Sequence, residues 1–127
     1  MSLLIKSTDL PGPPEGRRFI GADHEGVPIS MFLVNAPSGS GPELHRHPYA
    51  EIFVLSAGEA EFQVGDVQLI ARAGDIVIAG AGAPHRFTSV SNEQLQLAAI
   101  HTASAMDTEW LTPDLATPSP TTSATGA

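Results

Sequence analysis

The residues of this chain best suited to chemistry are three histidines and one glutamate. His45, His47 and Glu51 follow one another at spacings of two and four, and His85 comes after a second glycine-rich segment. Side chains two apart on an extended strand point to the same face, so the first three can converge on one point if the strand runs unbroken across Pro48. Three imidazole nitrogens and one carboxylate oxygen suit a first-row divalent metal. The spacing therefore predicts one metal site.

The ligand types leave the identity of that metal open. Imidazole and carboxylate accept Fe, Mn, Ni, Co, Cu and Zn, and selection among these ions follows geometry and supply as well as affinity. An octahedral ion with four protein ligands keeps two positions free. Substrate oxygens or O₂ could occupy these positions, so the site could be catalytic.

Short strands must position these residues. Between positions 19 and 101, apolar segments are interrupted by turn residues every eight to twelve positions. Gly65-Asp66, between Val64 and Val67, is typical of a two-residue hairpin turn. So many short strands in one domain favour an all-β barrel or double-sheet jelly roll. The predicted strands cover 27–35, 44–48, 51–56, 60–64, 67–71, 75–79, 85–90 and 95–102.

The two ends of the chain have a different composition. Residues 1–18 are expected to hold an N-terminal strand near 3–7 and a Pro/Gly-rich spacer. The barrel is expected over 19–111, ending in a short helical or irregular segment near 103–111. Residues 112–127 are rich in Pro, Thr and Ser, and we expect a disordered tail there because this composition cannot bury apolar surface.

Composition limits the class of protein. A chain of 127 residues is one domain. Six basic against fourteen acidic residues, a net charge of −8, argues against a nucleic-acid partner. No apolar run reaches the ~20 residues that span a bilayer, so no membrane partner is expected. The absence of cysteine and of a signal-peptide pattern favours a cytoplasmic location.

Two segments resemble the two motifs of the cupin superfamily. The first is carried by Gly39, His45-Arg46-His47, Glu51 and Gly58, which match every spacing of that motif. The second is carried by Gly74, Gly82 and His85, with Gly80 in place of the usual proline and Ser89 in place of the usual asparagine. The resemblance implies a small single-domain cupin-2 protein with a double-stranded β-helix, or jelly-roll, barrel. It also implies that His45, His47, Glu51 and His85 hold the metal, with iron(II) or manganese(II) as the leading ions.

Parity along the strands suggests what surrounds the metal. Phe53 and Leu55 share the parity of Glu51, and Phe87 shares that of His85, so these three residues are predicted to wall a substrate pocket. His101 has two interpretations. It is either a base or a residue supporting a ligand at the pocket rim, or a surface histidine at the end of a strand.

The predicted function is that of a metal-dependent enzyme acting on a small organic substrate. We slightly favour an Fe(II)- or Mn(II)-type dioxygenase, which needs no base beyond the ligands. One alternative is Lewis-acid isomerase, lyase or decarboxylase chemistry, for which His101 would be the base. The other is a non-catalytic barrel that binds a metal or a small ligand. The resemblance implies a homodimer in which N-terminal strands pair across subunits.

Overall fold

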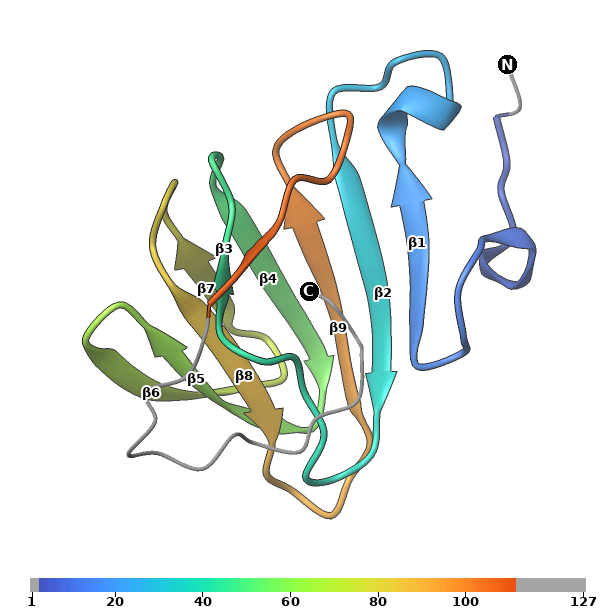
Figure 1. Ribbon diagram of the computed structural model, residues 1–127. Helices are drawn as coiled ribbons and strands as arrows, with labels where there is room; N and C mark the ends of the chain where they lie inside the picture. The colour runs from blue at the N-terminus through green and yellow to red at the C-terminus, as the bar shows by residue number, and fades with distance from the viewer. Residues whose placement is uncertain (1–2, 112–127) are drawn as a thin grey trace.

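The computed structural model describes residues 3–111, which form two antiparallel β-sheets (Figure 1). The strands are β1 Gly16–Ile20, β2 Ser30–Ala36, β3 His45–Arg46, β4 Glu51–Ala57, β5 Glu59–Val64, β6 Val67–Arg72, β7 Ile76–Ala79, β8 His85–Ser89, β9 Leu95–His101 and β10 Glu109–Trp110. Two short 3₁₀ helices cover Ser7–Asp9 and Gly21–Asp23. Sheet A has the order β1-β2-β9-β4-β7 and sheet B the order β10-β3-β8-β5-β6. The predicted all-β jelly-roll barrel is confirmed.

The two sheets face each other over an apolar core. Alternate residues of β4, β8 and β9 are buried, as expected for sheets with one covered face. Phe53 of sheet A lies 5.0 Å from Phe62 of sheet B, and Phe62 lies 5.3 Å from Phe87, measured between ring centroids. All three rings are at most 1% exposed. Burying each of them contributes about 1.5–3 kcal/mol, so this cluster holds the sheets together.

The chain does not run as one strand across Pro48, which was the condition for a shared parity of His45, His47 and Glu51; the separately predicted strands at 44–48 and 51–56 correspond to β3 and β4. Strand β3 ends at Arg46 in sheet B, and β4 begins at Glu51 in sheet A. Proline has no N–H to donate to a ladder, which favours a break at this point. The intervening residues carry the chain from one sheet to the other, so His45 and Glu51 lie on opposite layers of the barrel.

The predicted N-terminal strand is also wrong. Residues 3–6 are not in a strand, and Ser7–Asp9 is a 3₁₀ helix. The edge of sheet A is occupied instead by β1, whose Gly16 is opposite Val34 of β2. The barrel therefore begins at 16 rather than 19.

The turns and the C-terminal part follow the sequence prediction more closely. Gly65 has a φ of 56° in the β5–β6 hairpin, a conformation that glycine adopts without strain. Residues 102–108 are irregular, and β10 then pairs with β3. The predicted tail at 112–127 lies outside the described residues. Within residues 3–111, no helix is long and apolar enough to span a bilayer.

Candidate metal centre

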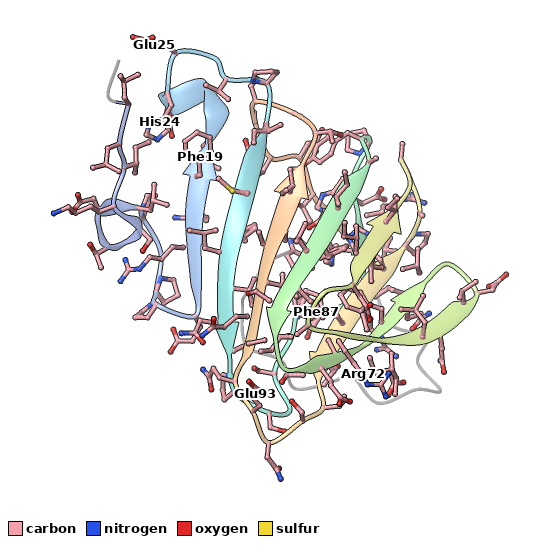
Figure 2. All side chains as sticks on the ribbon, turned by 180° about the vertical axis from the view of Figure 1, so that it is seen from behind. Phe19, His24, Glu25, Arg72, Phe87 and Glu93 are labelled. Carbon is pink, nitrogen blue, oxygen red and sulfur yellow. The ribbon has the colours of Figure 1, made fainter. Side chains whose placement is uncertain are left out.

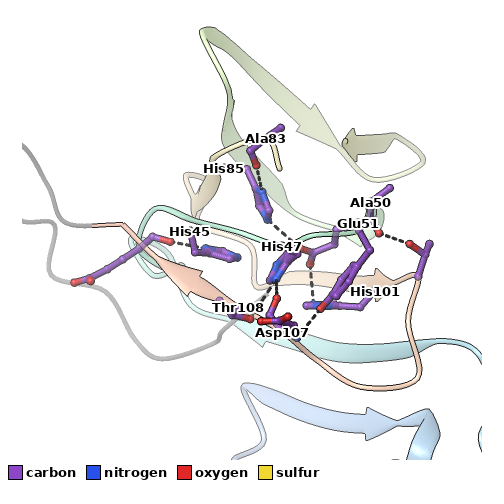
Figure 3. A network of polar contacts seen from close by, with 12 residues as sticks. His45, His47, Ala50, Glu51, Ala83, His85, His101, Asp107 and Thr108 are labelled. Atoms are coloured by element: carbon purple, nitrogen blue, oxygen red, sulfur yellow. Dashed lines mark hydrogen bonds and ion pairs between the residues drawn. The ribbon is translucent and has the colours of Figure 1, made fainter. Parts of the chain in front are cut away.

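The three predicted histidine ligands and the glutamate meet at one end of the barrel (Figure 3). His45 lies on β3, His47 in the following loop, Glu51 at the start of β4 and His85 at the start of β8. Each offers one ligand atom, and the four atoms lie within 4.8 Å of one another. All four side chains are at most 2% exposed.

Strand register explains why residues from both sheets converge. In sheet B, His45 is the cross-strand partner of His85. In sheet A, Glu51 is the cross-strand partner of His101, the last residue of β9. Both pairs point into the barrel, so the sheets bring them face to face. The ligands therefore come from opposite sheets and still point toward one another.

Backbone carbonyls orient the three imidazoles. Nδ1 of His45 lies 2.7 Å from the carbonyl oxygen of Glu43, and Nδ1 of His85 lies 2.9 Å from that of Ala83. Nδ1 of His47 lies 2.9 Å from the carbonyl oxygen of Asp107. A carbonyl can only accept a hydrogen bond, so each Nδ1 carries the proton. In the neutral rings, every Nε2 then presents a lone pair, as in metal-ligating histidines.

The spacing of the donor atoms fits one cation. Oε1 of Glu51 lies 2.9 Å from Nε2 of His47 and 2.9 Å from Nε2 of His85. Two ligand atoms about 2.1 Å from one ion and at right angles to each other would be about 3 Å apart. Nε2 of His45 and Nε2 of His47 are buried without a hydrogen-bond partner. Buried polar atoms are rarely left unpaired, so these atoms fit a site for a divalent metal.

Local electrostatics favour the protonation states that coordination requires. Burial alone would raise the pKa of the Glu51 carboxyl. The imidazoles of His101, His47 and His85 outweigh burial and hold that pKa well below its usual range. Burial lowers the pKa of His45 to about 4, although its bond to the Glu43 carbonyl opposes this shift. At neutral pH, Glu51 is therefore an anion and His45 a neutral ligand.

His101 lies inside the barrel, so its interpretation as a surface histidine is wrong, and its role as a base or as support for a ligand stays a prediction. Its side chain is fully buried, and its Nε2 is 3.2 Å from Oε2 of Glu51. Its Nδ1 is 2.6 Å from the hydroxyl of Tyr49, which accepts a hydrogen bond from the backbone N–H of Asp107 at 3.1 Å. The Glu51 carboxylate can only accept, which places the His101 proton on Nε2 and leaves Nδ1 to accept the phenol proton of Tyr49. This tautomer is the opposite of that in the three ligands.

The predicted pocket residues lie deeper than expected. Phe53, Leu55 and Phe87 are at most 2% exposed and belong to the packed core. Of the three, Phe53 contacts the centre, with its ring centroid 5.8 Å from that of His85. Their role as pocket walls stays a prediction.

Residues of the C-terminal segment complete the centre, and the sequence analysis did not assign them to it. Asp107 supplies its carbonyl to His47 and its N–H to Tyr49. The Trp110 ring lies 4.8 Å from that of His45. Backbone contacts between distant segments leave no trace in composition or spacing. For Trp110, the one signal in the sequence was that an aromatic residue stands outside any apolar run.

A cleft reaches the residues that surround the donor atoms. It has a volume of about 510 Å³, and its lining includes Phe32, Met106, Thr108 and Trp110. The Phe32 ring lies 5.8 Å from that of His101, and the Thr108 hydroxyl lies 3.2 Å from Nδ1 of His47. A smaller hollow of about 300 Å³ includes His47 in its lining. The cleft is therefore one side chain away from the candidate metal ligands.

Fold and site together define a small single-domain barrel with a candidate metal centre at one end. A family model described as the cupin domain matches residues 32–101, more than half of the chain. The protein therefore belongs to the cupin domain family. No curated protein matches its sequence.

Solved structures share the fold at low sequence identity. Oxalate decarboxylase from Bacillus subtilis is 17% identical with a TM-score of 0.76, over 84% of this chain and 31% of that one. Oxalate decarboxylase from Lactobacillus farciminis is 22% identical with a TM-score of 0.70, over 82% of this chain and 34% of that one. The chain thus spans about a third of their length. An uncharacterised protein with a double-stranded β-helix domain from Klebsiella pneumoniae is 20% identical with a TM-score of 0.65, over 86% of this chain and 96% of that one.

Proposed function

We propose that this protein is a metal-dependent enzyme that binds one divalent transition metal and acts on a small organic molecule. The observation that carries the proposal is the set of buried donor atoms from His45, His47, Glu51 and His85, all within 4.8 Å of one another. When bound, such a metal supplies a Lewis acid that polarises a carbonyl or carboxyl oxygen, or a centre at which O₂ reacts.

His101 favours proton-transfer chemistry at this centre. A catalytic acid or base must lie within hydrogen-bond reach of the reacting group. Nε2 of His101 is 3.2 Å from Glu51, and Tyr49 holds the other ring nitrogen at 2.6 Å. The ring is therefore fixed with its proton directed toward the ligands. This geometry supports a Lewis-acid isomerase, lyase or decarboxylase. Decarboxylation is also the activity named for two proteins of similar fold.

A dioxygenase is the second candidate. The ligand set of three imidazoles and one carboxylate also suits Fe(II) or Mn(II), and an oxygenase would not require His101 as a base. Mn(II) centres are named for the Bacillus subtilis oxalate decarboxylase. The aromatic rings of Phe32 and Trp110 border the centre and would limit the access of water.

The cleft beside the centre is the proposed substrate compartment. Its volume of about 510 Å³ lies within the range of small-molecule pockets. Apolar walls from Phe32, Met106 and Trp110 would contact the carbon skeleton of a substrate. Movement of the Phe32 or Trp110 side chain would open a path for the substrate from the cleft to the donor atoms.

The test is turnover by protein loaded with one metal at a time. Metal-free protein is loaded with Fe(II), Mn(II), Ni(II), Co(II), Cu(II) or Zn(II). It is then assayed under air and under argon against 2-oxo acids, oxalate, diketones, thiols and phenols. Turnover under argon that falls in a His101→Gln variant supports the proton-transfer enzyme. Turnover that requires O₂ and consumes it in proportion to product supports the dioxygenase. Tight metal binding without turnover of any of these substrates would instead favour a non-catalytic binding barrel.

A further inference from the structure

The cleft beside the candidate metal centre holds a cationic side chain. Its lining is mainly apolar, and among the described residues that form it only Arg18 and Asp23 are charged. Arg18 on β1 is the cross-strand partner of Phe32 on β2, and both residues line the cleft. Directly opposite residues of an antiparallel pair point to the same face of the sheet. Arg18 therefore lies on the face of sheet A that also carries the candidate metal centre.

Alternation along β1 separates Arg18 from its two neighbours in sequence. Successive side chains of a strand point to opposite faces, so Arg17 and Phe19 point outward. The Phe19 ring stacks on that of His24, and the two rings lie side by side at one end of β1 in Figure 2. The guanidinium of Arg17 donates to the carbonyl oxygen of Leu10 at 3.2 Å. Of the two adjacent arginines, Arg18 is therefore the one that faces the cleft.

The guanidinium of Arg18 is free to bind a ligand. The residue is exposed, and within residues 3–111 its side chain has no hydrogen-bond or ion-pair partner. Arg46, by contrast, lies 2.7 Å from the carboxylate of Glu109. A guanidinium presents its N–H donors in a planar fork that matches the two oxygens of a carboxylate. An unpaired arginine in the wall of a mainly apolar cleft therefore suits the charged end of an otherwise apolar ligand.

We propose that Arg18 binds a carboxylate of the substrate, and that the substrate is an organic acid with an apolar body. This inference rests on the proposed function, because it takes the cleft as the substrate compartment. Phe32, Met106 and Trp110 would contact the apolar body. A chain with a net charge of −8 repels anions, so a local cation is needed to hold one. The nearby carboxylate of Asp23 favours a singly charged carboxylate over a doubly charged phosphate ester.

The width of sheet A determines where this carboxylate lies relative to the metal ligands. Arg18 lies on β1 and Glu51 on β4, three strands away in the sheet. At about 4.8 Å per strand, the two backbones are about 14 Å apart. An arginine side chain bridges only part of that distance. The substrate therefore carries its carboxylate several ångströms from the oxygen that reaches the donor atoms. Oxalate, whose two carboxyl groups adjoin, is too short to reach both places.

The test follows the indole N–H signal of Trp110 by NMR, since this residue is the single tryptophan of the chain and lines the cleft. Metal-free wild type is titrated with 4-phenylbutyrate, 4-phenylbutan-1-ol, 4-phenylbutylamine and 3-phenylpropyl phosphate. The carboxylate should bind at least about ten-fold more tightly than the alcohol or the amine, and no less tightly than the phosphate ester. Arg18→Gln should abolish this preference, whereas Arg18→Lys should keep part of it because the charge remains.

Arg86→Gln is the matched control. Arg86 alternates with the buried residues of β8 and faces outward from sheet B. Its side chain also has no hydrogen-bond or ion-pair partner in the described part of the chain. Its replacement removes the same charge as Arg18→Gln and should leave the carboxylate preference unchanged. Thermal unfolding of the three variants checks that each stays folded.

Three results would overturn the inference. The first is a wild type without the carboxylate preference, including an indole signal that none of the probes shifts. The second is tighter binding of the amine or the phosphate ester. The third is an equal loss of the preference in Arg18→Gln and Arg86→Gln, because the effect would then come from net charge alone.

Metal retention by the same wild type separates this result from the proposed function. A carboxylate preference without metal retention supports the Arg18 site and contradicts the metal-dependent enzyme. Metal-dependent turnover without the preference contradicts the Arg18 site alone.

Discussion

Nε2 of His101 lies 3.2 Å from Oε2 of Glu51, across the neighbouring strands β9 and β4 of sheet A. The other oxygen of Glu51 faces His47 and His85 at 2.9 Å. One carboxylate therefore contacts both the metal-ligand cluster and a fourth imidazole with the opposite tautomer. This relationship links the candidate metal centre to His101, the proposed acid–base residue, and the predictions below follow from it.

Replacing His101 should separate metal binding from catalysis. A His101→Gln variant keeps the four proposed ligands and a polar group near Glu51. Metal content should therefore match the wild type, while turnover under argon should fall at least about 100-fold, the usual range for loss of an acid–base residue. Elemental analysis and steady-state kinetics on the same sample measure both. Unchanged turnover in a fully loaded variant would exclude the proton-transfer role.

Tyr49→Phe should weaken the positioning of His101. The substitution removes the hydroxyl that lies 2.6 Å from Nδ1 of His101 and accepts the N–H of Asp107. Loss of these hydrogen bonds should reduce the free energy of unfolding by about 1–2 kcal/mol. It should also alter the pH profile of kcat, because Nδ1 loses its partner. A profile and stability identical to the wild type would show that Tyr49 does not position His101.

The metal-free protein should lose stability as pH falls. Burial lowers the pKa of His45 from 6.5 to about 4 in the folded protein, so the folded state binds fewer protons than the unfolded state. The contribution of His45 to the free energy of unfolding, on the order of 3 kcal/mol, is fully present above pH 6.5 and is lost as the pH falls toward 4. The lowered pKa of the Glu51 carboxyl also makes the folded protein lose stability as the pH falls, over a lower pH range.

Urea denaturation of metal-free protein between pH 8 and 4 measures this dependence. A His45→Asn variant is the control, because it should show a shallower loss over the same interval. Stability that rises as the pH is lowered from 6.5 would contradict the assignment of His45 as a buried neutral imidazole.

Gly58→Ala should destabilise the turn between β4 and β5. Gly58 has a φ of 78°, and an added Cβ would lie 2.9 Å from the Gln94 carbonyl oxygen and from the Leu95 Cα. Strain at such a position costs about 1–3 kcal/mol. Gly80→Ala is the matched control, since nothing lies within 4 Å of its added Cβ. Thermal unfolding should show a lower Tm for the Gly58 variant alone, and equal Tm values would refute the prediction.

The ligand spacing and strand alternation could be predicted because both depend on residues close together in sequence. The inward direction of the His101 side chain could not be predicted, since a residue at the end of a strand faces inward or outward according to its neighbours. Register places Glu51 directly opposite it. Strand β1 was missed because Arg17-Arg18 interrupts its apolar pattern, and pairing with β2 stabilises it nonetheless. The Asp107 carbonyl is a main-chain group, and side-chain patterns carry no information about it.

Metal stoichiometry tests the central claim most directly. Metal-free protein equilibrated with Mn(II) or Fe(II) and passed over a desalting column should retain one ion per chain. His45→Ala and Glu51→Gln should each weaken binding at least 100-fold, because each removes one of the four proposed ligands. His24→Ala is the control, since this histidine stacks on Phe19 outside the centre and should leave binding unchanged. A wild type that retains no metal, or ligand variants that bind as tightly as the wild type, would contradict the account.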